Sequence, residues 1–570
     1  MRPEVMSDGI APTAARHHQT DPTAVAESPP VAERLFWPAA LGLLLLFVML
    51  SWLARPGGIG TGQDDAIYLF LARSLRALGY QDIYHVGDPG HHMYPPGYPA
   101  LLLVLGAFFG ERIAFFQAFG IAAATGALAL IAVVLRRLWS SAIALVVLGA
   151  LVFNPHLVGT GAKIGTDATY LLLSMLALAL LARRNPSPRL LLAAAAAAIA
   201  AALTRSVGVA LLAGIWAHWM LERRFAAATL FTAAGSITVG SWLVWTVVAP
   251  EKYVGRSYVA DAAVTGEGEV SFAVVLLARA VINLTKYFAY FIPNRIGSPP
   301  LPGPGRFEIP HLPALDAFDL LTAVAVAVGL MAGLSVLWKR WRAAATNVLA
   351  YGAMLTVWPW SIGRFLNVLI PLLVIALLLG VHALAQRVRT GWGFPAMLTL
   401  GLGLVLVGGV RSAKLINQRN YCEWGSQLPA PECRREESGA FFNVLEHIEL
   451  NVPQEAVIVS AKPAPVYYFT ERKTIPLGRV LAQHPEDLID FFRSQQVQYV
   501  ILGRLHTADY HQVSHLLERN CEALALEAAF EPHTYLFRVL QAGVVAPDGA
   551  ACAALTAYRE AGSPQNTENP

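Results

Sequence analysis

Long apolar runs alternate with short basic clusters along most of the chain. Most runs have the length that an α-helix needs to cross a membrane, roughly 17–25 residues. The pattern therefore predicts a polytopic α-helical membrane protein with about eleven crossings. The crossings are expected near residues 35–54, 112–135, 140–158, 166–182, 189–203, 206–221, 226–248, 316–337, 343–360, 364–384 and 392–410.

The basic clusters set the orientation, because cytoplasmic loops carry the excess of Lys and Arg. They are Arg136-Arg137, Arg183-Arg184, Arg223-Arg224, "WKRWR" at 338–342, and Arg387 with Arg389. Placing all of them in the cytoplasm puts residues 1–34, a polar stretch without periodicity, inside as a disordered tail. The membrane part then covers 35–411 and has large outer loops at 55–111 and 249–315. Within the first loop, the apolar segment 98–110 is too short to cross and is expected to be interfacial or half-inserted.

The sequence pattern changes after residue 411, where the long apolar runs end. Short apolar stretches such as "AVIVS" and "VQYVIL" predict an exported α/β domain over 412–545, followed by a flexible tail over 546–570. All four cysteines, Cys422, Cys433, Cys521 and Cys552, lie in this segment. An even number on the outer side predicts one or two disulfides, whose pairing the sequence leaves open.

Composition agrees with this assignment. The chain is 55% hydrophobic and 14% charged, whereas about a quarter of the residues of a soluble domain are charged. The net charge of +4 is small and does not favour nucleic acid. We therefore expect a multi-pass protein of the inner (plasma) membrane. The lipid bilayer is one of its expected partners.

Asp64 and Asp65 begin an amphipathic helix directly after the first crossing. Its apolar positions, which include Ile67, Phe70 and Leu78, predict that it lies on the outer membrane surface. One aspartate is enough to cap a helix, but two neighbouring carboxylates repel each other unless something uses them. The pair is therefore a candidate catalytic site at the outer boundary.

The stretch "HHMYPPGYPALL" (91–102) follows in the same loop. Its prolines predict an extended turn that carries Tyr94 and Tyr98, which could contact substrate or anchor the chain at the membrane interface. His91 and His92 are adjacent and form a poor chelate, so solvated loop residues are expected there.

These segments together resemble the GT-C membrane glycosyltransferases. The likeness is greatest to the bacterial branch grouped with the protein O-mannosyltransferases and the lipid A aminoarabinose transferases. An acid pair after the first span and the "YPPGYP" turn are typical of the first outer loop of this family. Similar segments follow in the same order: "KIGTDATYLLLSMLALALLARR" (163–184), "ALTRSVGVALLAG" (202–214), "GRFLNVLIPLLVIALL" (363–378) and "VYYFTERKTIPL" (466–477). The aminoarabinose branch has a lysine where this chain has Tyr94, so the acceptor of that branch is not carried over.

The resemblance implies a transferase that uses a sugar on polyprenyl phosphate and inverts the anomeric centre. It assigns the general base to Asp64, with Asp65 in support and Asp167 as a second outer acid. For Asp167 an N-cap of the fourth crossing is the alternative. Candidates for the donor phosphate are the outer cations Lys163, Arg205, Arg295 and Arg364, of which Arg205 and Arg364 lie in family-like motifs. Each of these side chains could instead reach out to the interface.

An outer-face enzyme has no access to cytoplasmic nucleotide sugars, and the chain has no convincing glycine-rich dinucleotide loop. The expected partners are therefore a polyprenyl-phosphate-linked sugar and a glycan, lipid or protein acceptor. No cofactor is indicated; a divalent metal remains open, without a visible ligand cluster. A transporter or flippase is the main alternative, and a non-catalytic scaffold is another. Transporters place ionisable residues inside their spans, whereas here they gather at the outer ends.

The topology can be tested with reporter fusions. A reporter fused after residue 415 should score as exported, and one fused after Arg184 as cytoplasmic, because the basic clusters fix the sidedness. Alkaline phosphatase and fluorescent-protein fusions measure this. The opposite pattern would reject both the orientation and the outer location of the acid pair.

Overall fold

The computed structural model describes residues 30–60, 62–183, 185–248, 272–297, 317–358, 363–417, 436–476, 488–503, 505, 507–546 and 549–561. Most of the predicted N-terminal tail, the last nine residues, Cys422 and Cys433 lie outside these ranges. So do residues 249–271 and 298–316 of the second outer loop.

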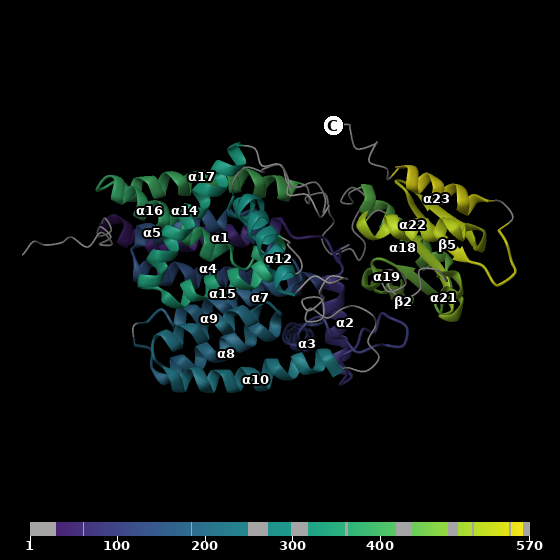
Figure 1. Ribbon diagram of the computed structural model, residues 1–570, viewed down its shortest axis with the longest axis horizontal. Coiled ribbons are helices and arrows are strands. Elements are labelled where there is room, and N and C mark those ends of the chain that lie inside the picture. Colours follow the sequence, from purple (N-terminus) through teal and green to yellow (C-terminus); the bar gives the residue numbers. More distant parts are fainter. Residues whose placement is uncertain are drawn as a thin grey trace, which may run out of the picture.

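Most helices run along the long axis of a bundle, and a sheet lies at one end of it (Figure 1). Among the described residues, seven helices are long and apolar enough to cross a membrane, or eight if one bent pair is a single span. The chain is thus a polytopic helical membrane protein, while the count of about eleven stays a prediction. The helices of the bundle are α1 (Pro30–Leu53), α4 (Ile113–Leu138), α5 (Ser141–Val152), α6 (Pro155–Gly161), α7 (Thr166–Leu180), α8 (Pro188–Thr204), α9 (Gly208–Leu221), α10 (Phe225–Val248), α14 (Ala317–Arg340), α15 (Arg342–Val357), α16 (Ile370–Val388) and α17 (Gly393–Asn417).

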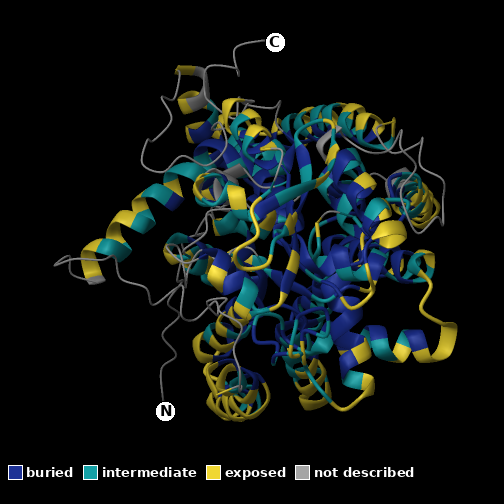
Figure 2. Ribbon diagram, turned by 90° about the vertical axis from the view of Figure 1, so that its right-hand side faces the viewer, coloured by how far each residue is buried: buried dark blue, intermediate teal, exposed yellow. Residues whose placement is uncertain are grey.

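The rim of the bundle is apolar. Viewed from the end that carries the sheet, exposed residues gather on the peripheral helices and buried ones at the centre (Figure 2). Leucine and other large apolar side chains remain exposed on α10, α14 and α17, for example Leu230, Ile237, Met331 and Leu406. Such a surface would be unfavourable in water and suits lipid.

The bent pair is α5 with α6, which meet at 70°. Asn154 causes the break, because its side chain accepts hydrogen bonds from the backbone N–H groups of His156 (3.1 Å) and Leu157 (3.2 Å) and caps α6. Pro155 occupies the first position of α6, where its missing N–H is not needed. The predicted single crossing at 140–158 is therefore broken near its end.

The second outer loop contains a helix that the sequence pattern did not predict. Helix α12 (Phe272–Lys286), the π-turn η1 (Tyr287–Phe291) and α13 (Ile292–Ile296) follow one another, and 273–296 is long and apolar enough to cross. Polar residues at helical spacing interrupt the apolar run of this segment, so the pattern did not indicate a crossing. Among them, Asn283 donates to the carbonyls of Leu355 (3.1 Å) and Trp358 (2.8 Å) at the end of α15. The last carbonyls of a helix lack the N–H donor that the next turn would supply, so these hydrogen bonds from Asn283 stabilise the helix end.

The first outer loop holds α2 (Asp64–Arg76) and α3 (Gly97–Phe109), where the two short helices were expected. The location of α2 on the outer membrane surface stays a prediction, but its apolar face is covered by protein. The helix is buried on most sides, since α3 packs on it and Tyr467 stacks on Phe70 with 5.2 Å between ring centroids. Leu78, assigned to the apolar face, is 98% exposed because it lies beyond the end of the helix.

Residues after 435 form a five-stranded mixed sheet with helices around it (Figure 1). The strand order is β2-β1-β3-β5-β4; β1 pairs in parallel with β2 and β3, and β5 pairs antiparallel with β3 and β4. The strands are β1 (Val457–Ser460), β2 (Thr474–Pro476), β3 (Val497–Leu502), β4 (Leu524–Phe530) and β5 (Thr534–Val539). The main helices are α18 (Glu436–Asn451), α19 (Pro463–Thr470), α21 (Leu488–Ser494), α22 (Thr507–Arg519) and α23 (Ala550–Ala561).

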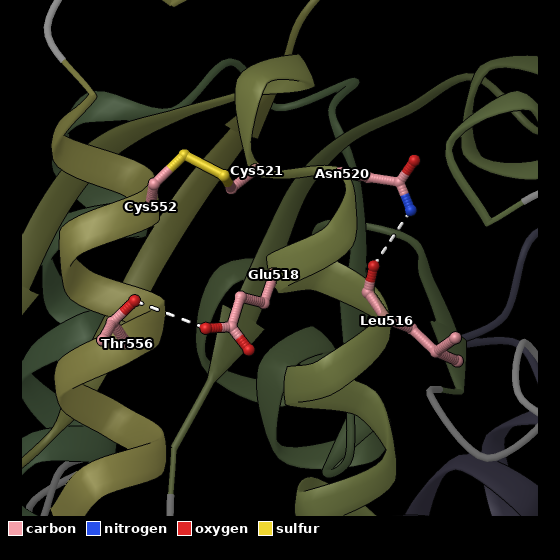
Figure 3. The surroundings of a disulfide bond; sticks show 6 residues. All are labelled: Leu516, Glu518, Asn520, Cys521, Cys552 and Thr556. Carbon is pink, nitrogen blue, oxygen red and sulfur yellow. Dashed lines mark hydrogen bonds between the residues drawn. A yellow bond between two sulfur atoms is a disulfide. The ribbon is translucent and has the colours of Figure 1, made fainter.

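A disulfide joins Cys521 to Cys552 and ties α23 to the chain that follows α22 (Figure 3). Thr556 on α23 donates to Glu518 on α22 at 3.4 Å, beside the bond. The expectation of a flexible tail over 546–570 is therefore wrong for residues 550–561. Alanine-rich α23 buries Leu555 and Tyr558 against the sheet unit, which an unpacked tail would leave in water.

The outer loop of the membrane part completes one edge of the sheet. Edge strand β2 receives backbone hydrogen bonds on its outer side: Thr474 N donates to Tyr84 O (2.9 Å), and Val86 N donates to Thr474 O (3.2 Å). Beside them, Lys473 forms an ion pair with Asp88 at 2.5 Å. The loop therefore behaves locally as a further strand.

Helices α14 and α16 pack at glycines, which gives a test of the fold. A Cβ at Gly333 would lie 1.6 Å from the carbonyl oxygen of Ala376, so Gly333→Ala must push the helices apart. We expect a loss of about 1–3 kcal/mol of stability, visible as a lower thermal unfolding temperature in detergent. Gly240→Ala on α10 is the matched control, because its Cβ would meet nothing within 4 Å. Equal unfolding temperatures for the two variants would contradict the packing.

Candidate active site

Asp64 lies in the first turn of α2, and contacts from two distant segments converge on it. Tyr94 donates its hydroxyl to Asp64 Oδ1 at 2.8 Å, and Arg364 Nη2 lies 2.5 Å from Asp64 Oδ2. Arg364 belongs to the short helical turn η2 (Gly363–Leu366) that precedes α16. Three of the residues predicted from sequence therefore form one cluster.

Asp65 has a different environment from its neighbour. Its two oxygens accept the backbone N–H groups of Gly60 (3.0 Å) and Ala66 (3.0 Å), so it fixes the turn that leads into α2. Desolvation raises the pKa of Asp65 to about 6, against the effect of these two hydrogen bonds, and the charge of Asp64 adds to the increase. The two carboxylates thus have different hydrogen-bond partners: backbone N–H groups for Asp65, and the side chains of Tyr94 and Arg364 for Asp64.

The second predicted acid, Asp167, forms an ion pair with Arg205. Asp167 is in the first turn of α7, and Arg205 ends α8 and also donates to Thr166 Oγ1 at 2.9 Å. Both side chains are largely buried, with exposures of 16% and 9%. Gly165 holds the N-cap position of α7, so the alternative of Asp167 as N-cap is not what the structure has.

Two cavities meet at the pair of Asp64 and Arg364, and both residues line both cavities. The first has a volume of about 300 Å³ and is mostly apolar, with Arg205 as its second cation. Its walls also include Tyr68, Met93, Tyr94, Pro95, Thr166, Thr204, Ser206, Val207, Trp358 and Phe365. The second has about 570 Å³ and a more polar wall, with Asp65, Asp167, Lys163, Arg295, His156, Gln117 and Asn367 among its residues.

The predicted cations are thus divided between the two cavities. Arg205 lines the apolar one, Lys163 and Arg295 line the polar one, and Arg364 lines both. Arg295 is held by His156, with 2.6 Å between Nη1 and Nδ1. Burial alone would lower the pKa of Arg364, but the Asp64 and Asp167 carboxylates raise it above its ordinary value, so Arg364 stays charged.

Tyr98 does not line either cavity. Its hydroxyl accepts the N–H of Gly165 at 2.9 Å, and its ring packs edge-on against Tyr68. Tyr98 therefore supports the turn before Asp167 from inside the fold, and its position does not favour direct contact with a substrate in either cavity.

His91 and His92 are buried, contrary to the expectation of solvated loop residues. His91 Nδ1 lies 2.7 Å from Asp82 Oδ1, and its Nε2 accepts the N–H of Tyr94 at 2.8 Å. Burial would raise the pKa of Asp82, but its interaction with His91, which includes the hydrogen bond at Nδ1, lowers it below the ordinary value. The pair therefore fixes the backbone that presents Tyr94 to Asp64. Among the described residues, no group of three or more His, Cys, Asp or Glu side chains is placed to hold a metal ion.

No protein-family model matches the sequence, and no curated protein matches it. Solved structures do match. ArnT from Cupriavidus metallidurans in the apo state aligns over 88% of this chain and 98% of its own, with 13% identity and a TM-score of 0.53. The same protein bound to undecaprenyl phosphate aligns over 91% and 100%, with 12% identity and a TM-score of 0.51.

The oligosaccharyltransferase AglB from Archaeoglobus fulgidus, in complex with an inhibitory peptide and a dolichol-phosphate, also aligns. It covers 89% of this chain and 75% of its own at 12% identity, with a TM-score of 0.51. These neighbours are GT-C superfamily glycosyltransferases. The chain has the GT-C fold. The resemblance inferred from short motifs is therefore confirmed at the level of architecture.

Several residues that line the two cavities escaped the sequence analysis. Trp358 and Tyr68 line the apolar cavity, and they lie in segments that were read only as helix or span ends. His156 was missed as well, although the Asn154-Pro155 dipeptide before it marks a helix break, and a break near a span end is where polar groups can line a cavity.

The buried ion pair of Asp167 with Arg205 gives a second test. Asp167→Ala should lower stability by about 3 kcal/mol, because it leaves the buried Arg205 guanidinium without its counter-ion. Adding Arg205→Met should recover most of that loss, since the double variant buries no charge. Thermal unfolding of the purified single and double variants measures the effect. A double variant as unstable as Asp167→Ala would contradict the pairing.

Proposed function

We propose that this protein is a glycosyltransferase. It moves a sugar from a polyprenyl-phosphate-linked donor to an acceptor hydroxyl on the outer face of the membrane. The observation that carries the proposal is the position of Asp64, which lies where a mostly apolar cavity with two guanidinium groups meets a polar cavity.

The apolar cavity suits the lipid end of such a donor. Val207, Trp358 and Phe365 offer an apolar wall, and Arg205 and Arg364 supply charge for one phosphate. Two GT-C neighbours are named as complexes with undecaprenyl phosphate and dolichol-phosphate, which supports a lipid phosphate as the ligand class.

The polar cavity suits the acceptor. Asp64 would take the proton of the acceptor hydroxyl as its oxygen attacks the anomeric carbon of the donor. The bond between that carbon and the phosphate oxygen breaks, and the electron pair leaves with the polyprenyl phosphate. Arg205 and Arg364 stabilise the negative charge that develops there, and Asp64 later returns its proton to water.

The remaining groups hold this arrangement. Asp167 keeps Arg205 in place, Asp65 holds the turn into α2, and Tyr94 orients Asp64. We assign the GT-C part to residues 35–417, because α17 continues past the predicted boundary at 411, and the sheet unit on the outer side to α18 through α23. Helix α2, which begins with the acid pair, and the sheet lie at the same end of the bundle, which supports a shared outer location (Figure 1).

A deletion strain provides the test. Mass spectrometry of its envelope glycans and lipids should reveal a missing sugar, and the wild-type gene should restore it. Asp64→Asn should fail to restore it at normal membrane abundance, with transfer reduced by at least about a hundredfold, because the base is lost. Asp490→Asn is the control, since that carboxylate is 80% exposed and lies on α21. Full restoration by Asp64→Asn would remove Asp64 from the base role.

A further inference from the structure

Arg364 is the cation that the two cavities share. Half of its side-chain surface is exposed (50%), and its hydrogen bond to Asp64 comes from one end of the guanidinium. Arg205, the other cation of the apolar cavity, is buried and held by Asp167 and Thr166. Of these two guanidinium groups, Arg364 is the more exposed to a second anion that enters the cavity.

The ion pair opposes what each partner would have to do in catalysis. A guanidinium next to a carboxylate favours its ionised form, so it makes the carboxylate a poorer proton acceptor. The same guanidinium gains most when it binds a phosphate with two parallel hydrogen bonds. Fully engaging the phosphate therefore requires Arg364 to weaken its contact with Asp64.

We propose that Arg364 exchanges partners during the reaction: it holds Asp64 before the donor arrives and moves to the donor's phosphate group when the lipid enters the apolar cavity. This inference rests on the proposed function. Tyr94 remains on Asp64 Oδ1 throughout and keeps the carboxylate in place after Arg364 leaves Oδ2.

The exchange links two events that catalysis needs at the same time. Movement of Arg364 frees Asp64 to accept a proton, and it brings positive charge to the leaving group. A phosphodiester donor carries one negative charge, and the lipid monophosphate that leaves carries up to two, so the attraction for Arg364 grows as the bond breaks. Binding of a lipid phosphate and the Asp64–Arg364 ion pair must then compete for one guanidinium.

This competition can be measured without knowing the sugar or the acceptor. The full-length protein in lipid nanodiscs is titrated with undecaprenyl phosphate. Asp64→Asn should bind this lipid about tenfold more tightly than the wild type, because Arg364 no longer has a competing carboxylate. Asp65→Asn is the matched control: it removes a neighbouring charge but not a partner of Arg364. Titration at pH 8 keeps Asp65 ionised in the wild type, since its pKa is about 6.

A second pair of variants separates exchange from general electrostatics. Arg364→Gln should weaken binding, and adding Asp64→Asn to it should restore little, because the competed group is absent. The inference is overturned if Asp64→Asn binds no more tightly than Asp65→Asn. It is equally overturned if the gain persists in the Arg364→Gln background. Absence of saturable binding to the wild type would instead reject the proposed function, and the exchange with it.

Discussion

Two ion pairs hold the candidate site together. That of Asp64 with Arg364 joins positions 300 residues apart in the chain, and that of Asp167 with Arg205 joins the ends of two neighbouring helices. The pair of Asp167 with Arg205 is the constrained one, because both side chains are largely buried and a buried guanidinium without its counter-ion would be strongly destabilising. The pair of Asp64 with Arg364 is more exposed, and both of its residues line the two cavities.

The network around Asp64 reaches outward through one loop. Asp82 holds His91, His91 accepts the backbone N–H of Tyr94, and Tyr94 donates to Asp64. Trp245 at the end of α10 donates to the carbonyl of His91 at 2.8 Å and attaches the loop to the bundle. A tyrosine therefore reaches Asp64 where the aminoarabinose branch has a lysine, so this position supplies a neutral donor instead of a positive charge.

The sequence predicted the parts of the fold that follow from length and apolarity. The acid pair, the short apolar helix after it and the cations at span ends were all found from local patterns. What it missed depends on partners far along the chain. Asn283 looked like a loop residue because its role is to bind carbonyls some seventy residues later. His91 was expected to be solvated, because the contacts that bury it, with Asp82 and with α10, cannot be recognised from the local sequence. Which cation lines which cavity, and that Arg364 lines both, likewise depends on three-dimensional packing.

The hydrogen bonds from residues 84–86 to β2 have a consequence for how the chain assembles. An uncovered edge strand invites pairing with other chains. Here the missing neighbour is the loop between α2 and α3, some 390 residues earlier in the chain. A fragment that begins after α17 would lack this loop and leave the edge of β2 uncovered, so it would be more prone than the full-length protein to pair with other chains.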